Sequence, residues 1–412
     1  MTSRKRVNAS LRYKEPDRVP IDLNGHRSSG IHVKAYKRLR EYLSLSPSAL
    51  YIYDFIQQLA IVEEDVLDVL GVDVFQLGCD FYKNSSYWKD WVMHDGTNTK
   101  IPAFIDVRAT PDGYVIYSRN GKPMGIQKHS CYYFEQNHFP LEEDVDKESF
   151  EDLTKIHEDI VWMDVPTPPG PREYVSPEGN KALKEIAAKT YHSTDRAIYG
   201  IFGGSLVESG QFTFRMDNFL CELLANPDRI HYYLDALFEM HMFNLKHYLE
   251  AVGDYIDVIG FGDDMGTQRG PQFSPAIYEE FFKPRHKKMW EYVHEHYPEV
   301  KICLHCCGSV RTLLPHLIEA GLDAINPVQF NCTGMDLREI KEEFQGKISF
   351  WGGGCETQDI LINEKPDAIT KHVSENVKIM KPGGGYIFQQ VHNIMADVPP
   401  ENIVAMYKGL QS

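Results

Sequence analysis

The chain alternates short runs rich in β-branched and aromatic residues with longer stretches of helical character, and this alternation limits its possible folds more than any other feature. Repeated strand–helix units predict a parallel sheet covered by helices. Eight such runs can be placed, which is the number of strands in a (β/α)8, or TIM, barrel. They are Val19–Leu23, Val72–Leu77, Ala197–Gly203, Tyr255–Asp264, Val300–Gly308, Asp323–Gln329, Lys347–Gly354 and Gly385–Asn393.

The regular repeat is interrupted by a long segment between about residues 80 and 195. Within it, Gly113–Tyr117 and Pro123–Gln127 flank an Asn120-Gly121 pair, which favours a tight hairpin turn. We therefore expect a β-hairpin region inserted into the barrel, together with an elaboration at the N-terminus. Because the insertion holds no core-sized segment of its own, the sequence predicts one domain over residues 1–412.

Charge and apolar runs exclude several classes of partner. The chain carries 59 acidic against 43 basic residues and a formal net charge of -16, which is the wrong sign for neutralising the phosphates of a nucleic acid. The basic start lacks the apolar stretch of a secretory signal, and no segment approaches the roughly 18 consecutive apolar residues of a membrane span. We expect a soluble, cytoplasmic protein without nucleic-acid or membrane partners.

The strongest chemical signal is the end of the fifth predicted strand, where His305 and Cys307 form a His-x-Cys pair. Residues two apart on a strand project to the same face, so both side chains can converge on one ion while Cys306 points into packing. An imidazole and a thiolate suit zinc. A buried core pair is the alternative, but a position at the carboxyl end of a barrel strand, where active sites lie, favours the metal.

A third ligand can come from either of two later strand ends. Cys355 follows three glycines, where the missing side chains allow close approach to an ion, and is the first choice. His392 is an alternative to Cys355 or a ligand alongside it, and it can instead contact substrate. Three protein ligands would leave one position open and make the metal catalytic, whereas four would make it structural.

Polar residues at other strand ends are candidates for catalysis and substrate binding. The adjacent Asp263 and Asp264 end the fourth predicted strand, and one of such a pair usually points at the site while the other caps a loop or helix. Glu208 is a further catalytic candidate, although its place at a helix start explains it equally well. The candidate substrate contacts are Gln268, His392 and Asn393.

Several of these segments together resemble the uroporphyrinogen decarboxylase superfamily, whose members fold as (β/α)8 barrels. The resemblance spans nearly the whole chain. The segments are Lys14–Pro20, Gly262–Gln268, His305–Gly308, Phe350–Gly354, Val391–Asn393 and Asp397–Asn402.

The superfamily contains metal-free decarboxylases and zinc-dependent methyltransferases that work with a corrinoid protein, and the residues resemble the second branch. His305-x-Cys307 is similar to the methyltransferases, and the decarboxylases usually carry an aliphatic residue at the position of Cys355. The segment Leu23–Ser29 matches poorly the Arg-Gln-Ala-Gly-Arg type of segment with which decarboxylases grip substrate carboxylates. The resemblance thus implies a zinc methyltransferase with Cys355 as the third ligand.

The resemblance also implies a substrate and a partner. Methyltransferases acting on coenzyme M or related thiols usually carry a cysteine where this chain has His392, so we expect demethylation of a small methoxylated aromatic compound. Because the chain lacks an Asp-x-His-x-x-Gly motif, the corrinoid (cobalamin) should arrive on a separate protein. The alternatives are a thiol methyltransferase of the coenzyme M type and a metal-free lyase of the uroporphyrinogen decarboxylase type. A further alternative is a non-enzymatic corrinoid-handling or interaction protein that uses the barrel as a scaffold.

Overall fold

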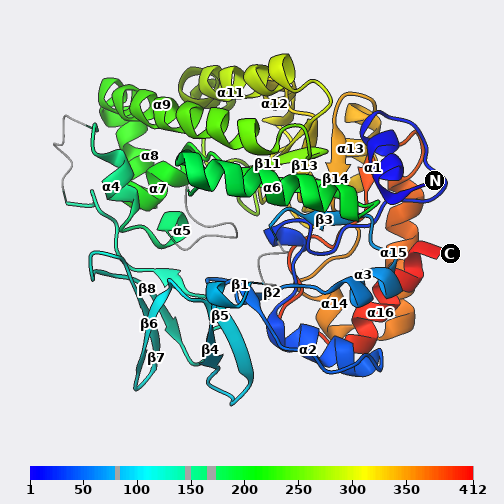
Figure 1. The fold of residues 1–412 in the computed structure, drawn as a ribbon. Coiled ribbons are helices and arrows are strands. Elements are labelled where there is room, and N and C mark those ends of the chain that lie inside the picture. The colour runs from blue at the N-terminus through cyan, green and yellow to red at the C-terminus, as the bar shows by residue number, and fades with distance from the viewer. Residues whose placement is uncertain (79–83, 144–149, 165–172, 412) are drawn as a thin grey trace.

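The computed structural model describes residues 1–78, 84–143, 150–164 and 173–411, and its centre is a curved parallel sheet (Figure 1). Seven strands pair in the order β15-β14-β13-β12-β11-β10-β3, and every neighbouring pair is parallel. Each lies within one of the predicted runs, which confirms the predicted fold class. The strands are β3 (Val74–Gln76), β10 (Ala197–Gly203), β11 (Val258–Gly262), β12 (Lys301–His305), β13 (Ala324–Asn326), β14 (Ser349–Trp351) and β15 (Tyr386–Ile387).

The first predicted strand, Val19–Leu23, is reduced to a short bridge that closes the barrel between β15 and β3. Ile21 pairs in parallel with Phe388, and the carbonyl of Ile21 accepts a hydrogen bond of 2.8 Å from the backbone N–H of Asp73. A regular strand does not form here, in part because Pro20 has no N–H to donate to a ladder. The segment nevertheless joins both free edges of the sheet.

Inward-facing side chains from the strands fill the barrel. Helix α1 (Ser3–Leu11) closes the amino-terminal end of the barrel, because its Val7 and Leu11 pack into one hydrophobic cluster with these strand side chains. The strand residues of this cluster are Val74, Ala197, Tyr199, Val258, Cys303, Ala324, Trp351 and Ile387. These side chains fill the amino-terminal part of the barrel. The carboxyl ends of the strands are therefore the place where a site can form.

Helices cover the outside of the sheet, as the strand–helix alternation predicts (Figure 1). Helix α13 (Leu337–Phe344) shows why these segments are helical: Asp336 caps its first turn, and Leu337, Ile340 and Phe344 form a buried stripe at helical spacing. The other longer helices are α6 (Pro177–Ser193), α7 (Val207–Phe214), α8 (Met216–Ala225), α9 (Pro227–Val252), α11 (Lys283–His296), α12 (Leu314–Glu319), α15 (Pro366–Met380) and α16 (Pro400–Lys408).

The N-terminal elaboration and the insertion add two more groups of elements. The elaboration includes α2 (Val33–Tyr42), β1 (Ile52–Asp54), β2 (Leu59–Ala60) and α3 (Glu64–Leu70). The insertion between β3 and β10 contains the antiparallel pair of β4 (Trp88–Val92) and β5 (Asn98–Pro102) and an antiparallel sheet of β6 (Asp106–Thr110), β7 (Gly113–Tyr117), β8 (Pro123–Lys128) and β9 (Glu135–Gln136). Short helices α4 (Leu153–His157) and α5 (Val161–Asp164) follow.

The predicted hairpin of the insertion is confirmed. Strands β7 and β8 pair from Gly113 with Lys128 to Tyr117 with Pro123, and Gly121 takes the left-handed φ of 77° that the turn requires. The expected start of the insertion near residue 80 lies outside the described residues. Among the described helices, none combines the length and the apolar character that crossing a membrane requires.

Candidate metal centre

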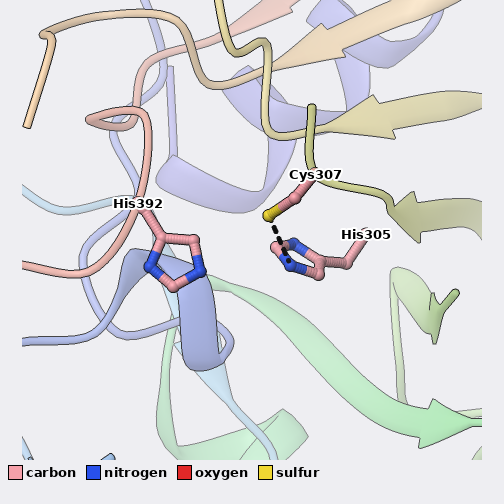
Figure 2. Close-up of side chains that lie close together, drawn as sticks. All are labelled: His305, Cys307 and His392. Carbon is pink, nitrogen blue, oxygen red and sulfur yellow. Dashed lines mark hydrogen bonds between the residues drawn. The ribbon is translucent and has the colours of Figure 1, made fainter. Parts of the chain in front are cut away.

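His305, Cys307 and His392 meet at the carboxyl ends of the barrel strands (Figure 2). One ligand atom from each lies within 4.8 Å of the ligand atoms of the other two, and all three residues are half-buried. The Cys307 Sγ is 3.4 Å from the Nε2 of His305. Figure 2 shows one ring nitrogen of His392 facing this pair while the other points away from it. The structure thus brings together the two predicted primary ligands and one of the two predicted third ligands.

Cys307 reaches the cluster from a loop and not, as expected, from the same strand as His305. Strand β12 ends at His305, so the two side chains do not share a strand face. The chain turns after Cys306: the N–H of Cys307 donates to Asp264 Oδ1 at 2.7 Å, and Gly308, at a φ of 87°, donates its N–H to Gln329 Oε1. Cys306 is fully buried in the core, as predicted.

The ring of His305 is fixed by a residue at the end of the neighbouring strand. Its Nδ1 lies 2.7 Å from the Oδ1 of Asn326, which ends β13. Asn326 is fully buried, and its Nδ2 donates to the carbonyl of Trp351 at 2.7 Å and to Gln389 Oε1 at 2.9 Å. The His305 ring therefore has its Nδ1 occupied and its Nε2 directed at Cys307.

The ring of His392 is held in a similar way by its neighbour in sequence. The Nδ1 of His392 lies 2.9 Å from the Oδ1 of Asn393, a buried residue whose Nδ2 donates to Gln57 Oε1 at 2.5 Å. Burial lowers the pKa of His392 to about 4, so its imidazole is neutral near neutral pH. A neutral imidazole is the form that binds a metal.

Carboxylates surround the thiol. Asp264 Oδ1 lies 3.7 Å from His305 Nε2 in addition to its contact with Cys307. Burial raises the pKa of the Cys307 thiol well above its ordinary value, and the negative charges of Asp264 and Glu208 raise it further. The pKa of Glu208 is also raised well above its ordinary value, by burial and by the nearby Asp264 and Asp263. The Asp264 carboxylate beside a thiol and an imidazole favours occupation of the site by a cation.

The residues present fit a zinc ion. Two imidazole nitrogens and one thiol sulfur are ligands that zinc prefers, and tetrahedral bonds of 2.0–2.3 Å place neighbouring ligand atoms about 3.5 Å apart. The observed 3.4 Å between Cys307 Sγ and His305 Nε2 agrees with that spacing. Three such ligands leave a fourth position for a substrate atom, which is the arrangement of a catalytic site.

Cys355, the first choice for the third ligand, lies outside this cluster. Its side chain is fully buried among core residues, and its Sγ contacts the carbonyl of Glu356 at 3.6 Å. Gly352 and Gly353 adopt φ values of 120° and 75°, and the chain packs there against Val328. The glycines allow close packing of the backbone here, and the structure groups His392 rather than Cys355 with the two primary ligands.

Asp263 and Gln268 are also placed differently from what we expected. The buried carboxylate of Asp263 accepts the backbone N–H groups that begin α7, from Leu206, Val207 and Glu208, at 2.9–3.1 Å. It acts as a cap, and Asp264 is the member of the pair that contacts the cluster. Gln268 is exposed in a turn, where its side-chain oxygen accepts from Cys332 Sγ. Asn393, the other predicted substrate contact, binds His392, and its contact with substrate stays a prediction.

Sequence reasoning missed two contributors to the site. Asn326 lies inside the predicted strand Asp323–Gln329, and a polar residue near a strand end is a signal that could have identified it. Tyr133 belongs to the insertion and donates its hydroxyl to Asn393 Oδ1 at 2.5 Å. No pattern in the sequence indicates that contact, because it depends on how the insertion packs against the barrel.

Comparisons with known proteins agree with this architecture. The family model for uroporphyrinogen decarboxylase (URO-D) matches residues 204–411, just over half of the chain, and this range contains His305, Cys307 and His392. A methyltransferase from Methanosarcina mazei has a similar structure, with a TM-score of 0.57 and 15% identity over 100% of this chain and 98% of that chain. At that identity the likeness shows the fold.

Curated relatives carry the name of the decarboxylase. Uroporphyrinogen decarboxylase from Thermosynechococcus vestitus is 26% identical over 182 residues, covering 42% of this chain and 49% of the relative. The enzyme of the same name from Aliarcobacter butzleri is 25% identical over 227 residues, covering 53% and 60%. The chain thus spans about half the length of the first of these relatives, and somewhat more of the second. Together with the barrel, the family match confirms the resemblance, and the chain belongs to the uroporphyrinogen decarboxylase family.

Proposed function

We propose that this protein is a zinc-dependent methyltransferase that moves a methyl group between a small substrate and the cobalt of a corrinoid carried by a separate protein. The proposed substrate is a methoxylated aromatic compound, and the proposed direction is O-demethylation. The observation that carries the proposal is the convergence of His305, Cys307 and His392 within 4.8 Å at the active-site end of the barrel. The structural likeness to a methyltransferase supports the choice of branch.

His305, Cys307 and His392 would hold the zinc ion. Bound there, zinc supplies Lewis acidity, which polarises an ether oxygen or lowers the pKa of a thiol. Asp264 fixes the loop that carries Cys307 through its bond to the Cys307 N–H. The three residues are half-buried, and three protein ligands would leave a fourth zinc position for the substrate.

In this proposal Glu208 handles the proton of the reaction. Breaking the bond between the methyl carbon and the ether oxygen leaves an aryloxide, which takes up one proton to become a phenol. Burial and the nearby carboxylates raise the pKa of Glu208 well above its ordinary value, which favours the protonated form that would donate this proton. Glu208 then remains as a carboxylate until it takes a proton from solvent.

A metal-free decarboxylase is the second candidate, because the similar curated relatives carry that name. A metal-free reaction does not require the grouping of one thiol and two imidazoles found here. The two candidates differ in their substrates, so they can be assayed side by side on the same protein.

The test uses the purified full chain with two reactions. We expect free cob(I)alamin to be converted to methylcobalamin when one of a panel of methoxylated aromatic compounds is present, and we expect no release of carbon dioxide from uroporphyrinogen. His305→Ala should abolish methyl transfer. Carbon dioxide release without methyl transfer would replace the proposal with the decarboxylase.

A further inference from the structure

We propose that Asn326 and Asn393 are positioning residues that hold His305 and His392 in the tautomer with the proton on Nδ1, so that the Nε2 lone pair of each ring faces the metal position. The inference deepens the proposed function, because it rests on the same three-residue centre. It assigns a role to two buried amides that lie outside the helices. It also explains how a histidine can serve as the third ligand.

The amide of Asn326 has only one orientation that satisfies its partners. The Trp351 carbonyl can only accept a hydrogen bond, so the group 2.7 Å from it must be the Asn326 NH₂. The other end of the amide is then the oxygen Oδ1, which lies 2.7 Å from His305 Nδ1. An oxygen can only accept, so Nδ1 carries the proton and Nε2 keeps its lone pair.

Asn393 reproduces this arrangement on the other ring. Its NH₂ donates to Gln57 Oε1 at 2.5 Å, which leaves Oδ1 as the acceptor for His392 Nδ1 at 2.9 Å. The remaining nitrogen of His392 is the one directed at Cys307 and His305 in Figure 2. The two rings therefore present equivalent nitrogens to the same point.

Each carboxamide oxygen also accepts a second hydrogen bond, from a hydroxyl group. Ser28 donates its Oγ–H to Asn326 Oδ1 at 2.7 Å, and Gln389 Nε2 holds that hydroxyl in place at 3.0 Å. Tyr133 donates its hydroxyl to Asn393 Oδ1 at 2.5 Å. Each oxygen thus accepts one hydroxyl and one imidazole N–H, which uses both of its lone pairs.

The cost of the other tautomer explains why the arrangement is stable. Moving the proton to Nε2 would set the bare Nδ1 against a carboxamide oxygen and leave a buried acceptor with one bond fewer. Asn326 and Asn393 are both almost completely buried, so water cannot replace the lost bond. Partners of this kind orient metal-binding histidines, and removing one typically weakens metal binding 10–100-fold.

The first experiment reads the tautomers directly. Protein labelled with ¹⁵N in the histidine rings is prepared without metal, and the ring nitrogens of His305 and His392 are assigned from the signals missing in His305→Ala and His392→Ala. At mildly alkaline pH both rings should show a protonated Nδ1 and an unprotonated Nε2. A protonated Nε2 on either ring would overturn the inference, and the result does not depend on whether the protein binds zinc.

The second experiment measures zinc affinity by competition with a chelator. Asn393→Leu should weaken zinc binding 10–100-fold, whereas Asn393→Asp, which keeps an acceptor for Nδ1, should stay within a few-fold of the wild type. Asn402→Leu is the matched control, because Asn402 is an equally buried amide that donates to the Leu361 and Glu364 carbonyls away from the site.

The outcomes separate this inference from the proposed function. Wild-type affinity in Asn393→Leu, or an equal loss in Asn402→Leu, would show that the amide has only a structural role. If the wild type bound no zinc, the proposed function would fail while the tautomers would still be read from the metal-free spectra. Thermal unfolding of each variant checks that it is folded before zinc binding is measured.

Discussion

The Asp264 carboxylate accepts a hydrogen bond of 2.7 Å from the backbone N–H of Cys307, and the same oxygen lies 3.7 Å from His305 Nε2. One side chain at the end of β11 therefore fixes the loop that follows β12 and adds negative charge beside the two primary ligands. Its neighbour Asp263 caps α7. The two aspartates have separate functions, and their substitutions should have separate effects.

Asp264→Asn should weaken zinc binding by 10–100-fold, because it removes negative charge beside the metal position and weakens the bond that holds Cys307. Affinity is measured by chelator competition on the purified variant. Asp254→Asn, at an exposed carboxylate that precedes the amino end of β11, is the control and should bind zinc like the wild type. Unchanged affinity in Asp264→Asn would remove Asp264 from the account of the site.

Asp263→Ala should lower the free energy of unfolding by about 2–4 kcal/mol, because three backbone N–H groups at the start of α7 lose a buried acceptor. Asp263→Asn, which keeps one oxygen acceptor, should cost less. Both are measured by urea unfolding, and zinc stoichiometry should stay at the wild-type level. If Asp263→Ala lost activity at unchanged stability, the original hypothesis of a catalytic Asp263 would return.

Zinc affinity should rise about tenfold for each unit of pH between about pH 6.5 and 8.5, since metal binding must displace one proton from a thiol. Affinity rises with pH because the pKa of Cys307 is raised well above its ordinary value, so the metal-free thiol is protonated across this range. His392, with a pKa lowered to about 4, is already neutral and releases no proton. Chelator competition at several pH values, corrected for the titration of the chelator itself, measures the slope. An affinity independent of pH would mean that Cys307 is not a ligand.

The third ligand can be tested by comparing two substitutions. His392→Ala should lower zinc occupancy and affinity strongly, because it removes one of three ligands. Cys355→Ala should leave zinc binding unchanged and cost about 1 kcal/mol of stability, since Cys355 is a small buried core residue. The reverse pattern would reinstate Cys355 as the ligand and show that the backbone after β14 rearranges when metal binds.

Much of the fold could be predicted from the sequence because strand–helix alternation and turn residues are local signals. The seven strands, the Asn120-Gly121 hairpin and the position of His305 at a strand end follow from such signals. The exclusion of Cys355 from the cluster depends on how three glycines pack against other elements, which no local pattern encodes. The same is true of Tyr133, whose contact with Asn393 joins the insertion to residues 260 positions away.

The contact of Asp263 with α7 is a second feature that could not be predicted from the sequence. An Asp-Asp pair at a strand end predicts one cap and one site residue, and the structure has both. The sequence could not decide which was which, because the capped helix follows β10, whereas the aspartates follow β11.

Zinc content is measured in the purified wild type, His305→Ala and Cys307→Ala, and methyl transfer to cob(I)alamin is assayed on the same samples. We expect about one zinc per wild-type chain, with zinc and methyl transfer lost together in both variants. Wild-type protein that carries no zinc and takes up none when zinc is supplied would rule out a zinc methyltransferase and favour the metal-free decarboxylase.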